Sequence, residues 1–381
     1  MSDRPAKALL EFFLTEDTLY TFVIRPDLPD KNIKDKGPIV VSSAVSEQEV
    51  QDVVKQIRTN YDQVKGKEHT QLDYDLSKFY ELGTKIFSPD LLKYLEAFNA
   101  LYLVPFGPLH YVPMHAFMIG GNRQGKDTGA SVHLIDRFQV AYLPSASVLQ
   151  YLKTRPPGRE NIQSVFLGGV DYKEDKIHFI RETDQISDLS VWENTEKVYL
   201  NYEEFTKEAF FEHAPGKAII HLSTHGFFND KDPLLSGAYL AGEYSDSHQD
   251  ADGRQESDYK NILTARDIFD HAELSAELFV LSGCFTGDSE NKPGDELIGL
   301  TRALIYAGVR SMIVSLFPSF KHISAKIDDS SIRFARFYEL WLGEGKSKGE
   351  ALQQYLQSIK ANPDFAHPYN WMQFILVGDM D

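Results

Sequence analysis

Two short segments of the sequence place a histidine and a cysteine just after apolar runs. His225 follows the run Ala218–Ser223, and Cys284 follows the run Leu278–Ser282. A cysteine nucleophile needs a neighbouring base that maintains the thiolate, and backbone N–H donors that hold an oxyanion. The pair therefore indicates cysteine-dependent acyl transfer, with Cys284 as the nucleophile and His225 as general base and acid.

The residues around this pair support the same chemistry. Gly226 and Gly283 flank the two side chains, and a glycine lets the backbone approach a substrate closely because it has no Cβ. A cysteine at the end of an apolar strand is often only a small buried side chain, so the pair carries more information than either residue alone. No phosphate-binding glycine loop, H-E-x-x-H, C-x-x-C or G-x-S-x-G motif is present.

The elements that must position the pair form an alternating pattern in the second half of the chain. Short apolar runs predict strands buried on both faces of a largely parallel sheet: Val165–Gly169, Lys197–Leu200, Ala218–Ser223, Leu278–Ser282 and Met312–Phe317. Apolar spacing of three and four predicts helices between or after them: Glu203–His213, Glu296–Tyr306, Asp328–Leu342 and Ser347–Ile359. The predicted fold class is α/β, and because neighbouring strands lie about 5 Å apart, their carboxyl ends can bring His225 and Cys284 together.

The first half of the chain has a different pattern. The stretch Leu9–Ile24 predicts a β-hairpin, and Ser46 and Ser88 have the spacing of helix caps. The run Ala100–Val104 predicts a buried strand that leads into a proline-rich shaped loop. A polar linker, Lys153–Glu160, predicts two domains, residues 1–155 and 160–381.

Composition excludes several classes of protein. The chain of 381 residues has 39 Lys and Arg against 56 Asp and Glu, a net charge of −17, which disfavours binding to nucleic acid or to an anionic membrane. One cysteine excludes an internal disulfide and a zinc ribbon, and it fits a reducing compartment. With no signal-peptide pattern and no run long enough to span a bilayer, the expected location is cytoplasmic.

Several motifs together resemble the CHAT domain, a caspase- and separase-like family of cysteine peptidases. The resemblance covers nearly the whole chain and rests on their number and order: Pro105–Pro113, Tyr142–Leu149, His221–Gly226, Pro233–Gly242, Leu263–Ile268, Val280–Gly287, Gly299–Leu304, Ala307–Ser311 and His367–Trp371. It implies a caspase-like, largely parallel sheet flanked by helices, with a packed non-catalytic N-terminal α/β half.

The resemblance also implies an activity. It implies an endopeptidase that cuts a specific protein substrate, with His225 and Cys284 as the dyad and the backbone N–H groups of Gly226 and Cys284 as the oxyanion hole. Neither a metal nor another cofactor is expected. Family members often carry repeat or sensor regions, which this chain lacks, so activation by a separate protein or by assembly is expected, in a role such as prokaryotic defence or cell death.

The sequence departs from the family near the expected substrate pocket. Where the family commonly has an acid after the strand that follows the nucleophile, this chain has Lys321, and Ser282 stands where some relatives have another acid. Together with Phe317, these residues predict a pocket for apolar or acidic side chains rather than for basic ones. The alternative is that Lys321 points into solvent.

Three further interpretations concern a histidine, an acidic stretch and an alternative function. His221 lies within a predicted buried strand and is expected to be a hydrogen-bonded core histidine. The acidic stretch Tyr244–Lys260 is expected to be a solvated loop that could serve in regulation or self-cleavage. The competing function is a protein-interaction module that keeps the fold while the dyad is idle.

Overall fold

The fold is taken from a computed structural model of the chain. The structure describes residues 6–25, 37–64, 75–120, 132–154, 162–172, 179–227, 229, 232–242, 259–283, 285–286, 296–317 and 334–381. It divides into two compact units, Met1–Gln150 and Tyr151–Asp381. The predicted domain ranges, 1–155 and 160–381, stay a prediction.

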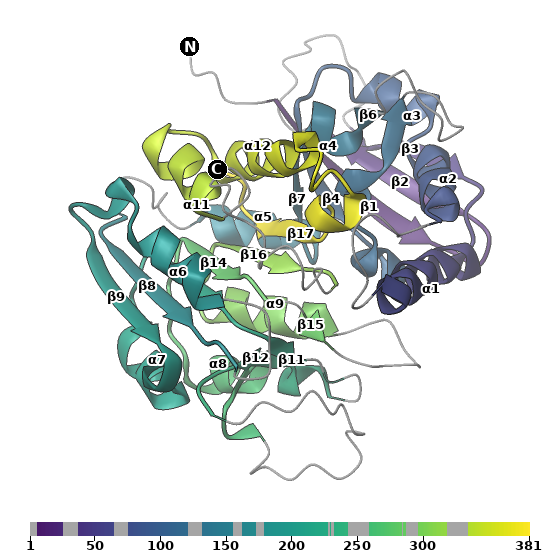
Figure 1. The fold of residues 1–381 in the computed structure, drawn as a ribbon. Helices are drawn as coiled ribbons and strands as arrows, with labels where there is room; N and C mark the ends of the chain where they lie inside the picture. Colours follow the sequence, from purple (N-terminus) through teal and green to yellow (C-terminus); the bar gives the residue numbers. More distant parts are fainter. Residues whose placement is uncertain are drawn as a thin grey trace. The chain divides into compact units, whose positions relative to one another are not determined.

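The first unit contains a mixed sheet in the order β3-β2-β1-β4-β7 (Figure 1). Its strands are β1 (Lys7–Leu14), β2 (Leu19–Ile24), β3 (Ile39–Ser43), β4 (Ala100–Val104) and β7 (Gln139–Tyr142). The first three pair antiparallel, whereas β4 runs parallel to β1 and to β7. The predicted hairpin and the buried strand β4 are thereby confirmed. A separate two-stranded ladder joins β5 (Met118–Gly120) to β6 (Val132–His133).

Helices of the first unit begin where serine caps were predicted. The Ser46 hydroxyl accepts from the Glu49 amide at 3.1 Å at the start of α1 (Glu47–Val64), and the Ser88 hydroxyl accepts from the Leu91 amide at the start of α3 (Pro89–Tyr94). The sequence reading missed α2 (Ser77–Ile86), most of which lies just beyond a polar stretch. The remaining helical elements are η2 (Gly107–Tyr111) and η3 (Met114–Ala116) in the proline-rich segment, α4 (Leu134–Arg137), and α5 (Ala146–Lys153), which runs into the second unit.

The second unit contains a largely parallel sheet in the order β17-β16-β14-β10-β8-β9. Its strands are β8 (Ser164–Gly169), β9 (Glu196–Asn201), β10 (Ile219–Ser223), β14 (Leu278–Leu281), β16 (Ser311–Ser315) and β17 (Phe374–Gly378). All neighbours pair parallel except β17, which is antiparallel to β16. This confirms the predicted α/β class and the five predicted strands. The sequence reading did not predict β17.

The helices of this unit are α6 (Phe179–Ser187), α7 (Lys207–His213), α8 (Ala265–His271), α9 (Glu296–Tyr306), α11 (Phe334–Tyr338), α12 (Lys348–Ala361) and α13 (Pro368–Trp371). A π-helical turn, Glu339–Gly343, continues α11, and single 3₁₀ turns lie at Ser190–Trp192, Tyr202–Glu204 and Pro233–Leu235. The expected helix Asp328–Leu342 is described only from Phe334 onward. Trp371 ends α13, which begins at Pro368, because proline fits the first position of a helix.

Opposite faces of β8 pack against α6 and against the segment that leads into α7. The ring of Phe166 lies 5.8 Å from those of Phe205 and Phe210 on one face. On the other face, a Cβ at Gly169 would lie 2.6 Å from the hydroxyl of Thr183, on α6. Figure 1 shows the two helices on either side of these strands. β8 is therefore buried on both faces, as expected for a nearly continuous apolar strand inside a parallel sheet.

A second, small sheet lies beyond the carboxyl ends of β10 and β14. It has the order β13-β12-β11-β15, formed by β11 (Gly226–Phe227), β12 (Gly237–Tyr239), β13 (Ile262–Thr264) and β15 (Phe285–Thr286). β11 and β15 are parallel, and the other pairs are antiparallel. Each strand is only two or three residues long, which is too short for period-2 patterning, so the sequence did not reveal this sheet.

Candidate active site

The two strands that precede His225 and Cys284 are direct neighbours. β10 and β14 pair parallel, with Leu222 opposite Leu281, and the Ser282 amide donates to the Leu222 carbonyl at 2.8 Å. Their carboxyl ends therefore lie at the same edge of the sheet, at the same level. This is the arrangement that the alternating pattern predicted for the strands.

The backbone stays paired after the two strands end. Gly226, immediately after His225, pairs with Phe285 in the β11–β15 ladder. Gly283 lies against the backbone on the other side of the histidine, where a Cβ would be 1.9 Å from the Thr224 carbonyl oxygen and 3.4 Å from the Gly226 nitrogen. Gly283 and Phe285 flank position 284, and Thr224 and Gly226 flank His225. The backbones of these two pairs lie against each other. Cys284 itself falls outside the described residues.

The His225 imidazole is enclosed by aromatic rings. Its ring centroid lies 4.9 Å from that of Phe179, nearly perpendicular to it, and 5.4 Å from that of Tyr172. Only 2% of the residue is exposed, and its carbonyl accepts from the Tyr239 amide at 2.8 Å. Backbone pairing and ring contacts together restrict this side chain to a defined position.

Tyr172 links the histidine to the small sheet. Its hydroxyl lies 3.2 Å from the Thr224 hydroxyl and donates to the Leu240 carbonyl, also at 3.2 Å. The Thr224 hydroxyl in turn donates to the Tyr239 carbonyl at 2.7 Å. Burial raises the pKa of Tyr172, so the phenol remains a protonated hydrogen-bond donor near neutral pH.

The predicted pocket residues have different environments. Ser282 is nearly buried at the end of β14, and Phe317 is buried just after β16. The ring of Phe317 packs edge to face on Tyr369, at 5.5 Å between centroids, as a core side chain does. Lys321 lies outside the described residues, as does nearly all of the acidic stretch Tyr244–Lys260.

A buried polar network lies on β10 beneath the histidine. His221 Nδ1 is 3.0 Å from the Tyr338 hydroxyl, and its Nε2 is 3.1 Å from Glu182 Oε1, which also accepts from the Ser223 hydroxyl at 3.0 Å. Burial and the Glu182 charge raise the pKa of Tyr338 well above its ordinary value, so Tyr338 donates. His221 is thereby confirmed as a hydrogen-bonded core histidine. Glu182 was not a predicted site residue, because α6 was not predicted.

A second charged cluster lies at the other end of the parallel strands. Lys348 is fully buried and ion-paired with Glu277, while Arg310 donates to Asp379 Oδ2 at 2.6 and 3.0 Å. Burial lowers the pKa of Lys348. Burial also raises the pKa of Asp379, but the charges of Lys348 and Arg310 outweigh it, and the net shift is downward. Because β10 and β14 end at the opposite edge, this cluster is structural and not part of the candidate site.

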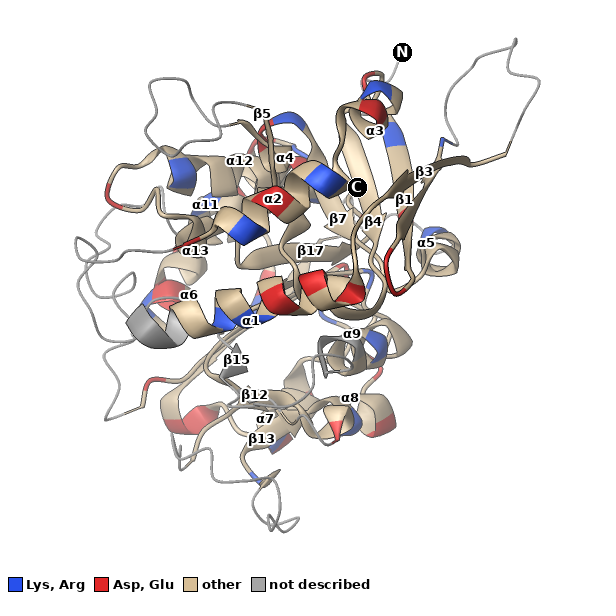
Figure 2. Ribbon diagram, turned by 90° about the vertical axis from the view of Figure 1, so that its right-hand side faces the viewer, with Lys and Arg blue, Asp and Glu red and all other residues tan. Residues whose placement is uncertain are grey.

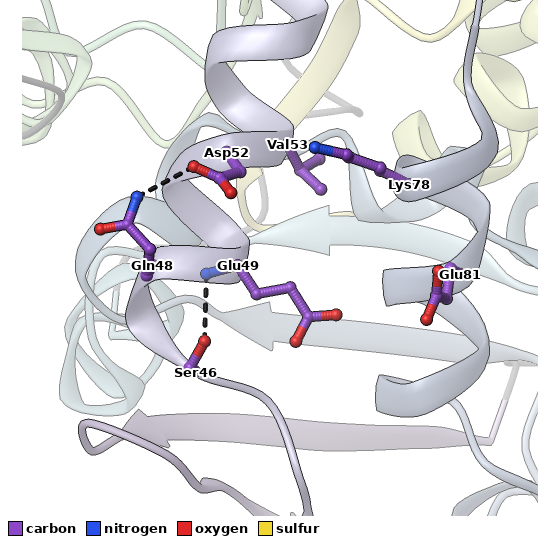
Figure 3. Close-up of a pocket in the computed structure, with 7 residues that line it drawn as sticks. All are labelled: Ser46, Gln48, Glu49, Asp52, Val53, Lys78 and Glu81. Atoms are coloured by element: carbon purple, nitrogen blue, oxygen red, sulfur yellow. Dashed lines mark hydrogen bonds between the residues drawn. The ribbon is translucent and has the colours of Figure 1, made fainter.

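A hollow of about 280 Å³ lies in the first unit, between α1 and α2 (Figure 3). Figure 2 shows acidic positions gathered at the beginning of α1. Glu49 is paired with Lys85 of α2 at 2.7 Å, and Gln48 donates to Asp52 at 2.9 Å. Glu49 and Asp52 therefore already have hydrogen-bond or ion-pair partners, and none of the residues that line the hollow is a predicted site residue.

In the described part of the chain, no three His, Cys, Asp or Glu side chains are grouped closely enough to hold a metal ion. Among the same residues, no helix is both long and apolar enough to cross a membrane.

Comparison with known proteins defines the class. The model of the CHAT domain family matches residues 78–379, which is more than half of the chain. The chain therefore belongs to the CHAT domain family, and the resemblance seen in its motifs is confirmed.

Solved structures show the same fold. Two crystal structures of the Saccharomyces cerevisiae separase–securin complex align with 98% of this chain and 30% of theirs, at TM-scores of 0.53 and 0.56 and 9% identity. The caspase-like fold similar to separase is thus confirmed.

Curated relatives match a shorter part of the chain. Tetratricopeptide repeat protein 28 is 32% identical in Homo sapiens and 31% in Mus musculus, each over 117 residues. The match covers 31% of this chain and 4% of those proteins.

Proposed function

We propose that the protein is a cysteine endopeptidase whose dyad is His225 and Cys284. The observation that carries this proposal is the backbone arrangement around the pair. Gly226 pairs with Phe285, and Gly283 lies against Thr224, so the chain segments that contain the two residues run side by side. A dyad needs such proximity, because the base must come within hydrogen-bond reach of the nucleophile.

The reaction follows from these roles. The Cys284 thiolate forms a C–S bond to the peptide carbonyl carbon, and the backbone N–H groups of Gly226 and Cys284 hold the oxyanion. The His225 imidazolium gives its proton to the leaving amine as the C–N bond breaks, which leaves a thioester. Neutral His225 then takes a proton from water, whose oxygen displaces the thiolate, and the product is a carboxylic acid.

The proposed substrate is a protein cut after an apolar or acidic residue. Lys321 in place of the acid common in the family supports this preference, because a cationic side chain would meet a like charge. We place the protein in a reducing compartment such as the cytoplasm, on its single cysteine. Activation by a partner protein, in a role such as prokaryotic defence, completes the proposal.

The dyad is tested without knowledge of the substrate. Cys284 is the only cysteine, so the rate of alkylation by iodoacetamide reports this thiol alone. We expect His225→Ala to slow alkylation of the folded protein about tenfold or more, because the thiolate loses its partner. Equal rates in the wild type and His225→Ala would overturn the dyad. Incubation with proteins that are encoded beside its gene, with Cys284→Ala as the inactive control, then identifies the substrate.

The second candidate is an interaction module with an idle dyad. It is favoured by the curated relatives, which are named for tetratricopeptide repeats and not for an enzymatic activity. If Cys284→Ala leaves the biological activity intact, and no thiol-directed probe labels the wild type with or without partners, this candidate replaces the peptidase.

A further inference from the structure

One helix, α6, contacts the side chains on one face of β10 and the histidine that follows it. His221 and Ser223 are two residues apart on the strand, so they point to the same face, and His225 follows two residues later. On the helix, Phe179 and Glu182 are three residues apart and therefore lie one above the other. Phe179 contacts the His225 ring, and Glu182 contacts the other two side chains.

The Glu182 carboxylate holds the strand through a single oxygen. Oε1 accepts from the Ser223 hydroxyl at 3.0 Å and lies 3.1 Å from His221 Nε2. Because an ionised carboxylate only accepts hydrogen bonds, Nε2 carries the imidazole proton, and Nδ1 accepts from Tyr338. His221 is fully buried and Ser223 nearly so, and a buried donor without a partner is costly. Glu182 therefore fixes α6 against the last residues of β10.

We propose that Glu182 is a positioning residue for His225. It binds the Ser223 hydroxyl two residues before the histidine, and it is one helical turn from Phe179, whose ring edge meets the imidazole at 4.9 Å between centroids. Loss of the carboxylate would free both the strand end and the start of the helix. The imidazole would then lose the ring contact that restricts its position. This inference rests on the proposed dyad.

The alkylation rate of Cys284 tests the inference in the full chain. We expect Glu182→Leu to slow alkylation by about tenfold, since displacement of a catalytic group by about 1 Å has effects of at least this size. Glu182→Gln keeps an oxygen that accepts from Ser223, and it should restore most of the wild-type rate. Asp184→Asn is the matched control on the same helix. Asp184 accepts from the Tyr199 hydroxyl at 2.6 Å, and this variant should react like the wild type.

Two variants keep the test decisive if Glu182→Leu does not fold. Ser223→Ala removes the hydroxyl that Glu182 binds, and Phe179→Leu removes the ring edge; each should slow alkylation in the same direction. A merely stabilising role would lower the melting temperature and leave the rate of the folded protein unchanged. The inference would be overturned if folded Glu182→Leu and folded Ser223→Ala both react at the wild-type rate. If Glu182→Leu does not fold, wild-type rates in both Ser223→Ala and Phe179→Leu would overturn it.

The two proposals fail in different ways. If His225→Ala reacts like the wild type, the dyad itself is wrong. If His225→Ala reacts slowly while the folded variants of Glu182, Ser223 and Phe179 react like the wild type, the dyad stands, and Glu182 has no positioning role.

Discussion

The backbone of Gly283 lies so close to Thr224 that a Cβ at position 283 would be 1.9 Å from the Thr224 carbonyl oxygen. No side chain fits this gap without moving one of the two strand ends. Glycine is therefore required here by the close approach of two backbones and not by an unusual φ angle. The contact aligns the segment that contains Cys284 with the segment that contains His225.

Gly283→Ala should separate these two segments. Overpacking of a tight contact costs about 1–3 kcal/mol in unfolding free energy, and here it also moves the proposed nucleophile away from its base. We expect a lower denaturation midpoint and slower alkylation of Cys284. Gly343→Ala is the control, because a Cβ there would make only an ordinary 3.5 Å contact with Val191. Equal behaviour of the two variants would contradict the prediction.

The hydroxyl and the ring of Tyr172 should have separable effects. Tyr172→Phe removes the contacts to Thr224 and Leu240, which should cost about 1 kcal/mol, but it keeps the ring beside His225. Tyr172→Leu also removes the ring. We expect alkylation of Cys284 to be slowed severalfold more by Leu than by Phe at matched folded fraction. The reverse order would show that the hydroxyl, and not the ring, supports the histidine.

Asp379→Asn should destabilise the protein in a pH-dependent way. The folded-state pKa of Asp379 lies below its ordinary value of 3.8, so its stabilising contribution is present above about pH 4 and is lost as the pH falls through the folded-state pKa. At pH 7 we expect a loss of about 3–5 kcal/mol, because Arg310 loses its buried anion.

Urea denaturation of the Asp379 variant at pH 7 and pH 3 measures this difference. The gap between the wild type and Asp379→Asn should narrow at the lower pH. Glu344→Gln removes a more exposed partner of Arg336 in the same unit and should change stability by less than about 1 kcal/mol. A gap that stays constant between the two pH values would contradict the assigned charge state.

The substrate preference can be tested with a peptide library. We expect cleavage after apolar or acidic residues, and we expect Lys321→Asp to increase cleavage after Arg and Lys at least tenfold relative to the wild type. Phe317 is packed on Tyr369 and is kept unchanged. Dominant cleavage after Arg or Lys by the wild-type protein would refute the proposed pocket.

Much of the main framework could be predicted from the sequence, because its elements have strong periodic signals. β4 is a continuous apolar run, and β10 and β16 are nearly so. α12 begins at a serine cap with the expected bond from the Glu350 amide to the Ser347 hydroxyl. α6 was missed, although Phe179, Ile180, Thr183 and Ile186 are buried along one face. These positions follow the spacing of one helix face, so this helix could have been predicted from its pattern.

The candidate site was only partly accessible from the sequence. The position of His225 after β10 follows from the apolar run, and the neighbouring strand β14 follows from the predicted parallel sheet. The contacts of Tyr172 and Phe179 with the imidazole depend on tertiary packing across separate elements, which no local pattern encodes. The role of Glu182 could not be predicted for the same reason, since its hydrogen-bond partners are 39 and 41 residues away in the chain.

Because Lys348 is fully buried, chemical labelling of its amine measures local opening of the second unit. Its amine is enclosed by an ion pair with Glu277 and lies 5.9 Å from the centre of the Trp341 ring. An amine-reactive label can therefore modify it only when that part of the protein opens, whereas Lys153 is exposed and is modified at once. Mass spectrometry of these two lysines measures, in one sample, how often the second unit unfolds under native conditions.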